Sequence, residues 1–276
     1  MFSLSRSRNP NSQECMPKAK TYGNYLRLDE LLALQKPRDE VEHDEMLFIV
    51  IHQVYELWFK VLLHEIDYCC ALLTKTDTPR ASHTLNRVLT ILKVLVKQLD
   101  ILETMNPSEF LTFRERLDSA SGFQSDQFRA LEAVLGRKTR ASVERFAEGT
   151  RAREALERRW SAPTLWDHFI RYLANEGHAV PEEQLARDMT QPVGPSEEMQ
   201  QVLVELYRSD PKNTALCERL VDLDEGLQEW RYRHVKMVER TIGTKSGTGG
   251  SAGSKYLLST LNSAVFPDLW EIRSQL

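Results

Sequence analysis

The sequence predicts an all-α protein, and three observations lead to this fold class. Apolar residues recur at helical spacing over long stretches, as at Leu85, Val88, Leu92 and Leu95. Start and stop signals for helices follow one another along the chain, as where Pro107 begins a new helical stretch. Alternating β-branched runs and hairpin dipeptides are scarce, so strands have little to form from. No internal repeat is visible, and we expect a single large helical bundle.

The first half of the chain contains the longest apolar stretches. A short helix is expected over 26–34, and a long one over 43–73 opens on acidic residues and ends near the polar TKTDTPRAS. The apolar period just described predicts a helix over 81–104. Helices over 107–117 and 124–135 follow.

The second half continues the helical pattern with more polar sequences. Helices are expected over 141–160, 165–175, 197–207, 215–241 and 255–265. The stretch QPVGPS, residues 191–196, is interpreted as a connection within the bundle. We therefore expect one helical domain over residues 21–276, preceded by a disordered tail over residues 1–20.

Composition restricts the possible partners. The 276 residues carry a formal charge of −4 with no basic stripe, so a nucleic-acid partner is not expected. The most apolar stretch, residues 46–63, is interrupted by His52, Gln53, Glu56 and Lys60, which argues against a membrane span. The four cysteines, Cys15, Cys69, Cys70 and Cys217, lack CxxC spacing and are interpreted as reduced thiols of a cytoplasmic protein.

Two histidines on separate expected helices are candidate ligands. His52 shares a helix face with Phe48, Tyr55 and Phe59, and His234 lies in the stretch EWRYRHVKMVER. Each histidine, taken alone, is more often an ordinary core residue satisfied by one hydrogen bond. No HExxH motif or pair of ExxH motifs is present, which disfavours zinc and di-iron sites. Two such helices can hold a flat cofactor between them, so haem is physically admissible.

A third candidate lies in the stretch PSEFLTFRERLDSASGFQS. Arg114 follows Phe110 by one helical turn, and Ser121 and Gly122 lie in a turn-like SASG. If Arg114 faces a pocket, its guanidinium suits a carboxylate, whereas the alternative is a surface arginine. Five of the twelve glycines lie within the eleven positions 243–253, which predicts either a solvent loop or a loop that orders over a ligand.

Several blocks together resemble tryptophan 2,3-dioxygenases, the haem-dependent tryptophan and indole dioxygenases. These blocks are YGNYLRLDELL, HDEMLFIVIHQVYELWFK, LETMNPSEFLTFRERLDSASGFQSDQFR, EWRYRHV and GTKSGTGGSAG, which occur in order over about residues 21–276.

The resemblance implies a role for each matching residue. His234 corresponds to the proximal ligand of the haem iron, and His52 corresponds to the distal histidine that faces the indole N–H. Ser121 corresponds to a haem-side position. The remaining matches are substrate contacts: Phe48 and Phe110 beside the indole, Arg114 at the carboxylate, Thr248 at the ammonium and carboxylate end, and Tyr22, Tyr25 and Leu26 on an arm that reaches a neighbouring subunit of a homotetramer.

The implied reaction inserts both atoms of O₂ across the indole C2–C3 bond of L-tryptophan, giving N-formylkynurenine, with haem b in its ferrous state. One departure is Ile51, which makes the wall beside His52 more apolar than is common in the family. A haem-dependent monooxygenase that forms a 2-oxindole from tryptophan or a substituted tryptophan is an alternative. A protein that binds haem or tryptophan without turnover, and a helical bundle without a ligand, are alternatives from other classes.

Overall fold

The computed structural model describes residues 20–38, 42–117, 120–247, 257–261 and 263–276. It confirms the all-α class, since these residues contain helices, turns and loops but no strand. The chain divides into two units, Met1–Lys36 and Pro37–Leu276. The first unit contains α1 (Tyr22–Leu26) and α2 (Leu28–Leu32), which Arg27 separates by adopting a left-handed conformation with φ of 53°.

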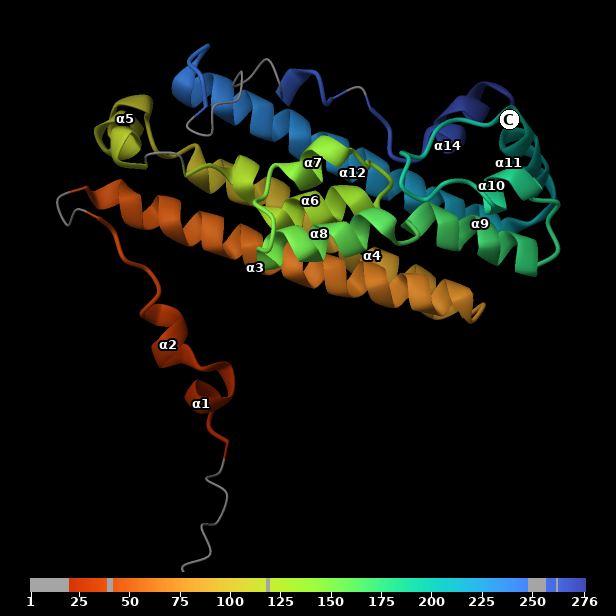
Figure 1. The fold of residues 1–276 in the computed structure, drawn as a ribbon, viewed down its shortest axis with the longest axis horizontal. Coiled ribbons are helices and arrows are strands. Elements are labelled where there is room, and N and C mark those ends of the chain that lie inside the picture. Colours follow the sequence, from red (N-terminus) through yellow and green to blue (C-terminus); the bar gives the residue numbers. More distant parts are fainter. Residues whose placement is uncertain (1–19, 39–41, 118–119, 248–256, 262) are drawn as a thin grey trace, which may run out of the picture. The chain divides into compact units, whose positions relative to one another are not determined.

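The second unit is built on a long helical hairpin. Helix α3 (His43–Thr74) runs antiparallel to α4 (Thr78–Leu102), and α12 (Pro211–Ile242) packs along α4 (Figure 1). Helix α4 begins at Asp77, whose side chain accepts a hydrogen bond from Arg80 N, with proline in the first turn. The buried faces of these helices form the main core.

Shorter helices cover this central group. Helix α6 contacts α3 and α8, α9 contacts α3, and α11 and α14 contact α12. The bounds of the remaining elements are α5 (Pro107–Arg114), η1 (Glu115–Leu117), η2 (Gly122–Gln124), α6 (Asp126–Val134), α7 (Arg140–Glu144), α8 (Arg151–Ser161), α9 (Leu165–Asn175), α10 (Glu182–Leu185), α11 (Glu197–Ser209), α14 (Pro267–Glu271) and η3 (Ile272–Ser274).

Three of the expected helices differ most from the observed elements. The helix expected over 141–160 is two helices, because Gly149 adopts a φ of 75° and Thr150 caps α8 through Arg153 N. The helix expected over 26–34 is the shorter α2, and α1 precedes it over residues for which no helix was expected. In the helix expected over 255–265, residues 257–258 are helical, residues 259–261 form a turn, and residues 263–266 are outside any helix.

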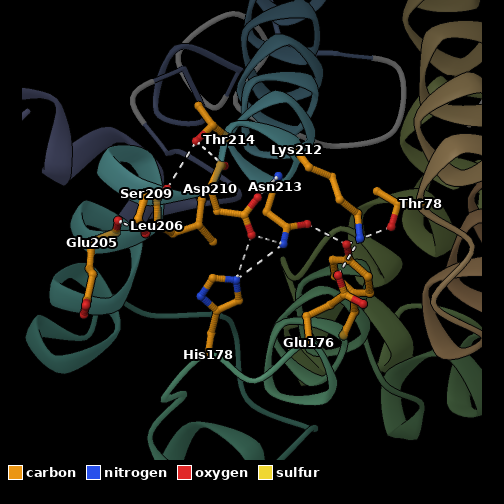
Figure 2. A network of polar contacts seen from close by, with 11 residues as sticks. Thr78, Glu176, His178, Glu205, Leu206, Ser209, Asp210, Lys212, Asn213 and Thr214 are labelled. Carbon is orange, nitrogen blue, oxygen red and sulfur yellow. Dashed lines mark hydrogen bonds and ion pairs between the residues drawn. The ribbon is translucent and has the colours of Figure 1, made fainter.

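A polar network fixes the start of α12. The Tyr172 hydroxyl donates to Asn213 Oδ1 at 2.5 Å and accepts from the Thr78 hydroxyl at 2.8 Å. Asn213 in turn donates to Asp210, the residue that caps α12, and His178 Nε2 lies 3.2 Å from the same carboxylate (Figure 2). The network ties α4, α9 and α12 together at one end and so helps to set the position of α12, which carries His234.

Helix α3 is long and apolar enough to cross a membrane by length and composition alone, in spite of the polar residues within 46–63. A core helix of a helical bundle meets the same criteria. Helix α3 packs against α4, α5, α6 and α9, and Ile51, Leu62 and Ile66 are buried there.

Candidate functional site

Six of the residues singled out from the sequence line one cavity. Its volume is about 200 Å³, and its walls come mainly from α3, α4, α5, α12 and residues 121–123. The six are Phe48, His52, Phe110, Arg114, Ser121 and His234. Residues distant in sequence therefore meet at one place in the second unit.

A second cavity of about 140 Å³ adjoins the first. The two cavities share seven lining residues, among them His52 and His234. The rest of the second cavity is strongly aromatic, with Phe59, Phe128 and Trp230 in its wall. The two histidines thus border both cavities, which are mainly apolar.

His52 is held in one tautomer by its own helix. Its Nδ1 lies 2.7 Å from the carbonyl oxygen of Phe48, one turn earlier in α3. A carbonyl can only accept, so Nδ1 carries the proton and Nε2 is left as the acceptor. Burial lowers the pKa of His52 below 6.5, which keeps the ring neutral at pH 7.

His234 is suited to bind a metal through a neutral imidazole. Burial is the main reason that its pKa falls to about 4, and the nearby His52 lowers it further. The ring is stacked on Trp230, one turn earlier in α12, with centroids 5.4 Å apart and planes 3° from parallel. A neutral ring nitrogen is the form in which histidine ligates iron.

The donor set fits haem better than a metal held by protein side chains alone. Among the described residues no group of three or more His, Cys, Asp or Glu side chains could hold a metal ion. One neutral histidine beside a mainly apolar cavity would suit the iron and the porphyrin of a haem. His52 borders the same space from α3. His234 would hold the iron of such a group.

Three phenylalanines form an aromatic wall in and behind the first cavity. The ring centroid of Phe48 lies 5.8 Å from that of Phe110 and 5.6 Å from that of Phe113, and the latter two meet edge to face at 5.4 Å. Phe113 is buried at 1% exposure and supports the other two rings from behind. Phe113 was not predicted as a site residue, although it follows Phe110 by three positions and so shares its helix face.

Arg114 connects helix α5 to the beginning of the glycine-rich segment. Its Nη2 donates to the carbonyl oxygen of Ser246 at 2.6 Å, and Gly247 lines the same cavity. Ser121 Oγ accepts a hydrogen bond from Phe123 N at 3.3 Å and so caps η2. Thr248, predicted as a contact to the amino-acid end of the substrate, lies outside the described residues.

The predicted arm belongs to the first unit. Tyr22 and Tyr25 in α1 are 76% and 69% exposed, and Leu26 is also exposed. The segment therefore presents apolar side chains that its own unit does not cover.

Two features of the cavities were missed in the sequence. Trp230 lies four residues before His234, so helical spacing alone places it on the same face. Arg129 and Arg231 line the second cavity, where both are almost fully buried. Their burial arises only when the bundle is assembled, and the sequence carries no local signal for it.

Taken together, the helical bundle and its mainly apolar cavity with two neutral histidines suit an all-α oxidoreductase that holds haem. Comparison with known proteins supports this class of protein. The family model described as tryptophan 2,3-dioxygenase matches residues 7–160 and 196–276. The chain belongs to the tryptophan 2,3-dioxygenase family. The match begins at residue 7, within the stretch predicted as a tail.

Curated relatives cover nearly the whole chain. A tryptophan 2,3-dioxygenase of Herpetosiphon aurantiacus is 57% identical over 262 residues, which is 95% of this chain and 100% of the relative. A tryptophan 2,3-dioxygenase of an Anaeromyxobacter species is 54% identical, with 94% and 97% covered. A tryptophan 2,3-dioxygenase of Caulobacter vibrioides is 45% identical, with 93% and 98% covered.

Proposed function

We propose that this protein is a haem-dependent enzyme that inserts both atoms of O₂ across the indole C2–C3 bond of L-tryptophan. The product is N-formylkynurenine, formed in the first step of tryptophan catabolism. The observation that carries the proposal is the meeting of His52, His234 and Arg114 at one aromatic cavity in a chain of this family. Ferrous haem b, when bound, supplies the site at which O₂ is activated.

The residues of the chain divide the remaining tasks. His234 would ligate the iron, since its burial keeps the imidazole neutral. His52 accepts the indole N–H through Nε2, because its Nδ1 proton is committed to the Phe48 carbonyl. This hydrogen bond orients the indole and need not remove its proton.

The substrate's side chain and its charged end are bound by different walls. The rings of Phe48 and Phe110 pack against the indole and exclude water. Arg114 receives the carboxylate, and Thr248 contacts the ammonium and carboxylate end from the glycine-rich segment. A carboxylate is a stronger acceptor than the Ser246 carbonyl that Arg114 now binds, so it can replace that carbonyl.

Two measurements test this function. The purified protein should show a Soret band, and mass spectrometry under ¹⁸O₂ should find two labelled atoms in the product. One labelled atom would indicate the monooxygenase alternative instead. A bound haem without any turnover of tryptophan would indicate a binding protein.

A separate test addresses the iron ligand. His234→Ala should lose stable haem incorporation, whereas Trp230→Phe should retain it because the ring beside the ligand is preserved. Full haem occupancy of His234→Ala, with an unchanged ferrous spectrum, would overturn the assignment of the ligand.

We also propose a cytoplasmic homotetramer that binds neither nucleic acid nor membrane. Buried free thiols at Cys69, Cys70 and Cys217 are consistent with a reducing compartment. The exposed apolar residues Tyr22 and Tyr25 would reach the active site of a neighbouring subunit. Light scattering should give four times the mass of the chain, and a fully active monomer would contradict this assembly.

A further inference from the structure

Phe123 lies at the boundary between the two cavities. It is one of the residues that line both of them, and it comes from η2, a single 3-10 turn between α5 and α6. Its side chain is partly buried. The position of this ring therefore helps to determine how the two cavities are closed.

The backbone of η2 gives the ring little support. Ser121 Oγ accepts a hydrogen bond from Phe123 N at 3.3 Å. Gln124 N donates to the Ser121 carbonyl at 2.9 Å, and Ser125 N donates to the Gly122 carbonyl at 3.1 Å. A single turn of this kind has poor hydrogen-bond geometry and is not stable by itself. The ring therefore depends on side-chain contacts to stay in place.

Two guanidinium groups lie over the Phe123 ring. The guanidinium of Arg145, at the end of α7, is 3.7 Å from the ring centroid, and that of the buried Arg129 is 4.7 Å away. At 3.7 Å the Arg145 guanidinium is in van der Waals contact with the ring, where the attraction between cation and π system adds to dispersion. Because Arg145 is exposed, it contacts the ring from the outer surface.

The backbone that carries Arg145 is fixed by a different arginine. Arg153, in α8, is 8% exposed, and its Nη1 donates to the carbonyl oxygens of Val143 at 2.9 Å and of Phe146 at 3.3 Å. These two carbonyls lie on either side of residue 145 in the chain. Val143 is also buried in a small apolar cluster with Leu156 of α8. The end of α7 is therefore a fixed support from which Arg145 reaches Phe123.

We propose that Arg145 is a positioning residue that holds the Phe123 ring at the boundary of the two cavities and so keeps the bound cofactor enclosed. The part of this inference that concerns the cofactor rests on the proposed haem-dependent function. A group as large as haem leaves a cavity more easily when part of the wall moves aside. Loss of the Arg145 contact increases the time that Phe123 spends away from its place in the wall, and so increases the rate at which haem leaves.

The first test needs no cofactor. Hydrogen–deuterium exchange at short labelling times is measured by mass spectrometry on the full-length haem-free protein, for the amides of residues 123–125 that bond within η2. Arg145→Gln should speed their exchange by about 3-fold to 10-fold, the factor that corresponds to the loss of one partly exposed cation–π contact. Arg145→Lys should restore part of the protection, because an ammonium keeps the charge but cannot stack as a plane.

Arg140→Gln is the matched control. Arg140 belongs to the same helix, and its guanidinium also lies over an aromatic ring, that of Trp160 at 4.7 Å, but neither residue lines the two cavities. This variant should leave the exchange of residues 123–125 unchanged. A double mutant isolates the contact, since Arg145→Gln should have no further effect in a Phe123→Leu protein.

The second test measures how fast haem leaves the loaded protein. Haem is transferred to an excess of a haem-binding apoprotein, and the change of the Soret band gives the rate constant of dissociation. Arg145→Gln should raise this rate constant by the same factor of about 3 to 10, and Arg140→Gln should leave it unchanged. Both variants remove a cation that lies over an aromatic ring, so an effect of general destabilisation would be seen in both.

The outcomes separate this inference from the proposed function. Unchanged exchange in Arg145→Gln, or an equal rise when Phe123 is already leucine, would overturn the role of Arg145. Faster exchange with an unchanged rate of haem loss would overturn the part that concerns the cofactor, and the proposed function would stand. If the unaltered protein binds no haem, the proposed function and the cofactor part both fail, while the exchange result still decides whether Arg145 holds Phe123.

Discussion

Replacing Arg114 by alanine tests how the cavity reads the charged end of the substrate. Arg114 is the only cation in the wall of the first cavity among the described residues, and its Nη2 now donates to the Ser246 carbonyl. When tryptophan binds, its carboxylate loses water and needs charge-assisted hydrogen bonds in return. Without Arg114 that compensation is lost, while the aromatic wall that is proposed to bind the indole is retained.

The position of Arg114 determines how large a loss of kcat/KM we expect from its replacement. Removing one partner of a buried hydrogen-bonded charge pair costs about 2–5 kcal/mol. Arg114 is partly exposed at the end of α5, so water can replace some of the lost interaction, and we expect the lower half of that range. A cost of about 2–3 kcal/mol corresponds to a fall of about 30-fold to 150-fold in kcat/KM for L-tryptophan.

The assay measures initial rates for L-tryptophan and for tryptamine, which lacks the carboxylate. The already poor turnover of tryptamine should barely change in Arg114→Ala, since that interaction was never made. Arg116→Gln is a matched control, because Arg116 is two residues away, pairs with Glu42 and does not line the cavity. Equal losses of kcat/KM on both substrates would show that Arg114 maintains the fold or the haem cavity instead.

Three further predictions concern stability. Asp224→Ala leaves three buried donors of the C-terminal segment unpaired and should lower the free energy of unfolding in urea by about 3–5 kcal/mol; a loss below about 1 kcal/mol would contradict this. Burial raises the pKa of Asp167, but the ion pair with Arg187 and hydrogen bonds from Thr164 outweigh it and place the folded pKa below 3.8. The stabilisation that ionised Asp167 provides is present above pH 3.8 and is lost as the pH falls through the folded pKa. The free energy of unfolding, measured as a function of pH, should therefore fall less steeply at acid pH in Asp167→Asn than in the unaltered protein. Identical slopes at acid pH would refute this. Gly136→Ala should cost about 1–3 kcal/mol, because φ is 103° and the new Cβ would lie 2.7 Å from Val193 Cγ2; an unchanged melting temperature would show that both strains relax.

The helical architecture could be predicted from the sequence because each long helix carries its own apolar period. Residues 81–104 and 165–175 match α4 and α9 closely, and local caps such as Asp77 and Thr164 fix where those helices begin. The break between α7 and α8 within residues 141–160 was harder to predict, since nearly all residues of this stretch suit a helix. Gly149 and the capping Thr150 decide the break, and both signals could have been read locally.

The site depended on information that periodicity does not contain. Helical spacing places His52 and His234 each on an apolar face, but it cannot say that these two faces meet. The resemblance to the family predicted that the two histidines face one site, and both line the cavities between α3 and α12. The burial of Arg129, Glu132 and Arg231 could not be predicted, because charged residues in helices are usually solvated and their burial appears only after the helices pack.

The hydrogen bond from His52 to the Phe48 carbonyl makes the tautomer of His52 independent of the side chain at position 48, which shapes the cavity. Its acceptor belongs to the main chain, whereas the ring of Phe48 packs on His52 at 4.1 Å between centroids. Side-chain replacement at position 48 can therefore reshape the cavity, which is the proposed indole site, while the protonation pattern of the imidazole stays the same. With the proposed binding mode, substrate preference can change through position 48 without a compensating change at His52, which makes this position a starting point for engineering the enzyme toward substituted indoles.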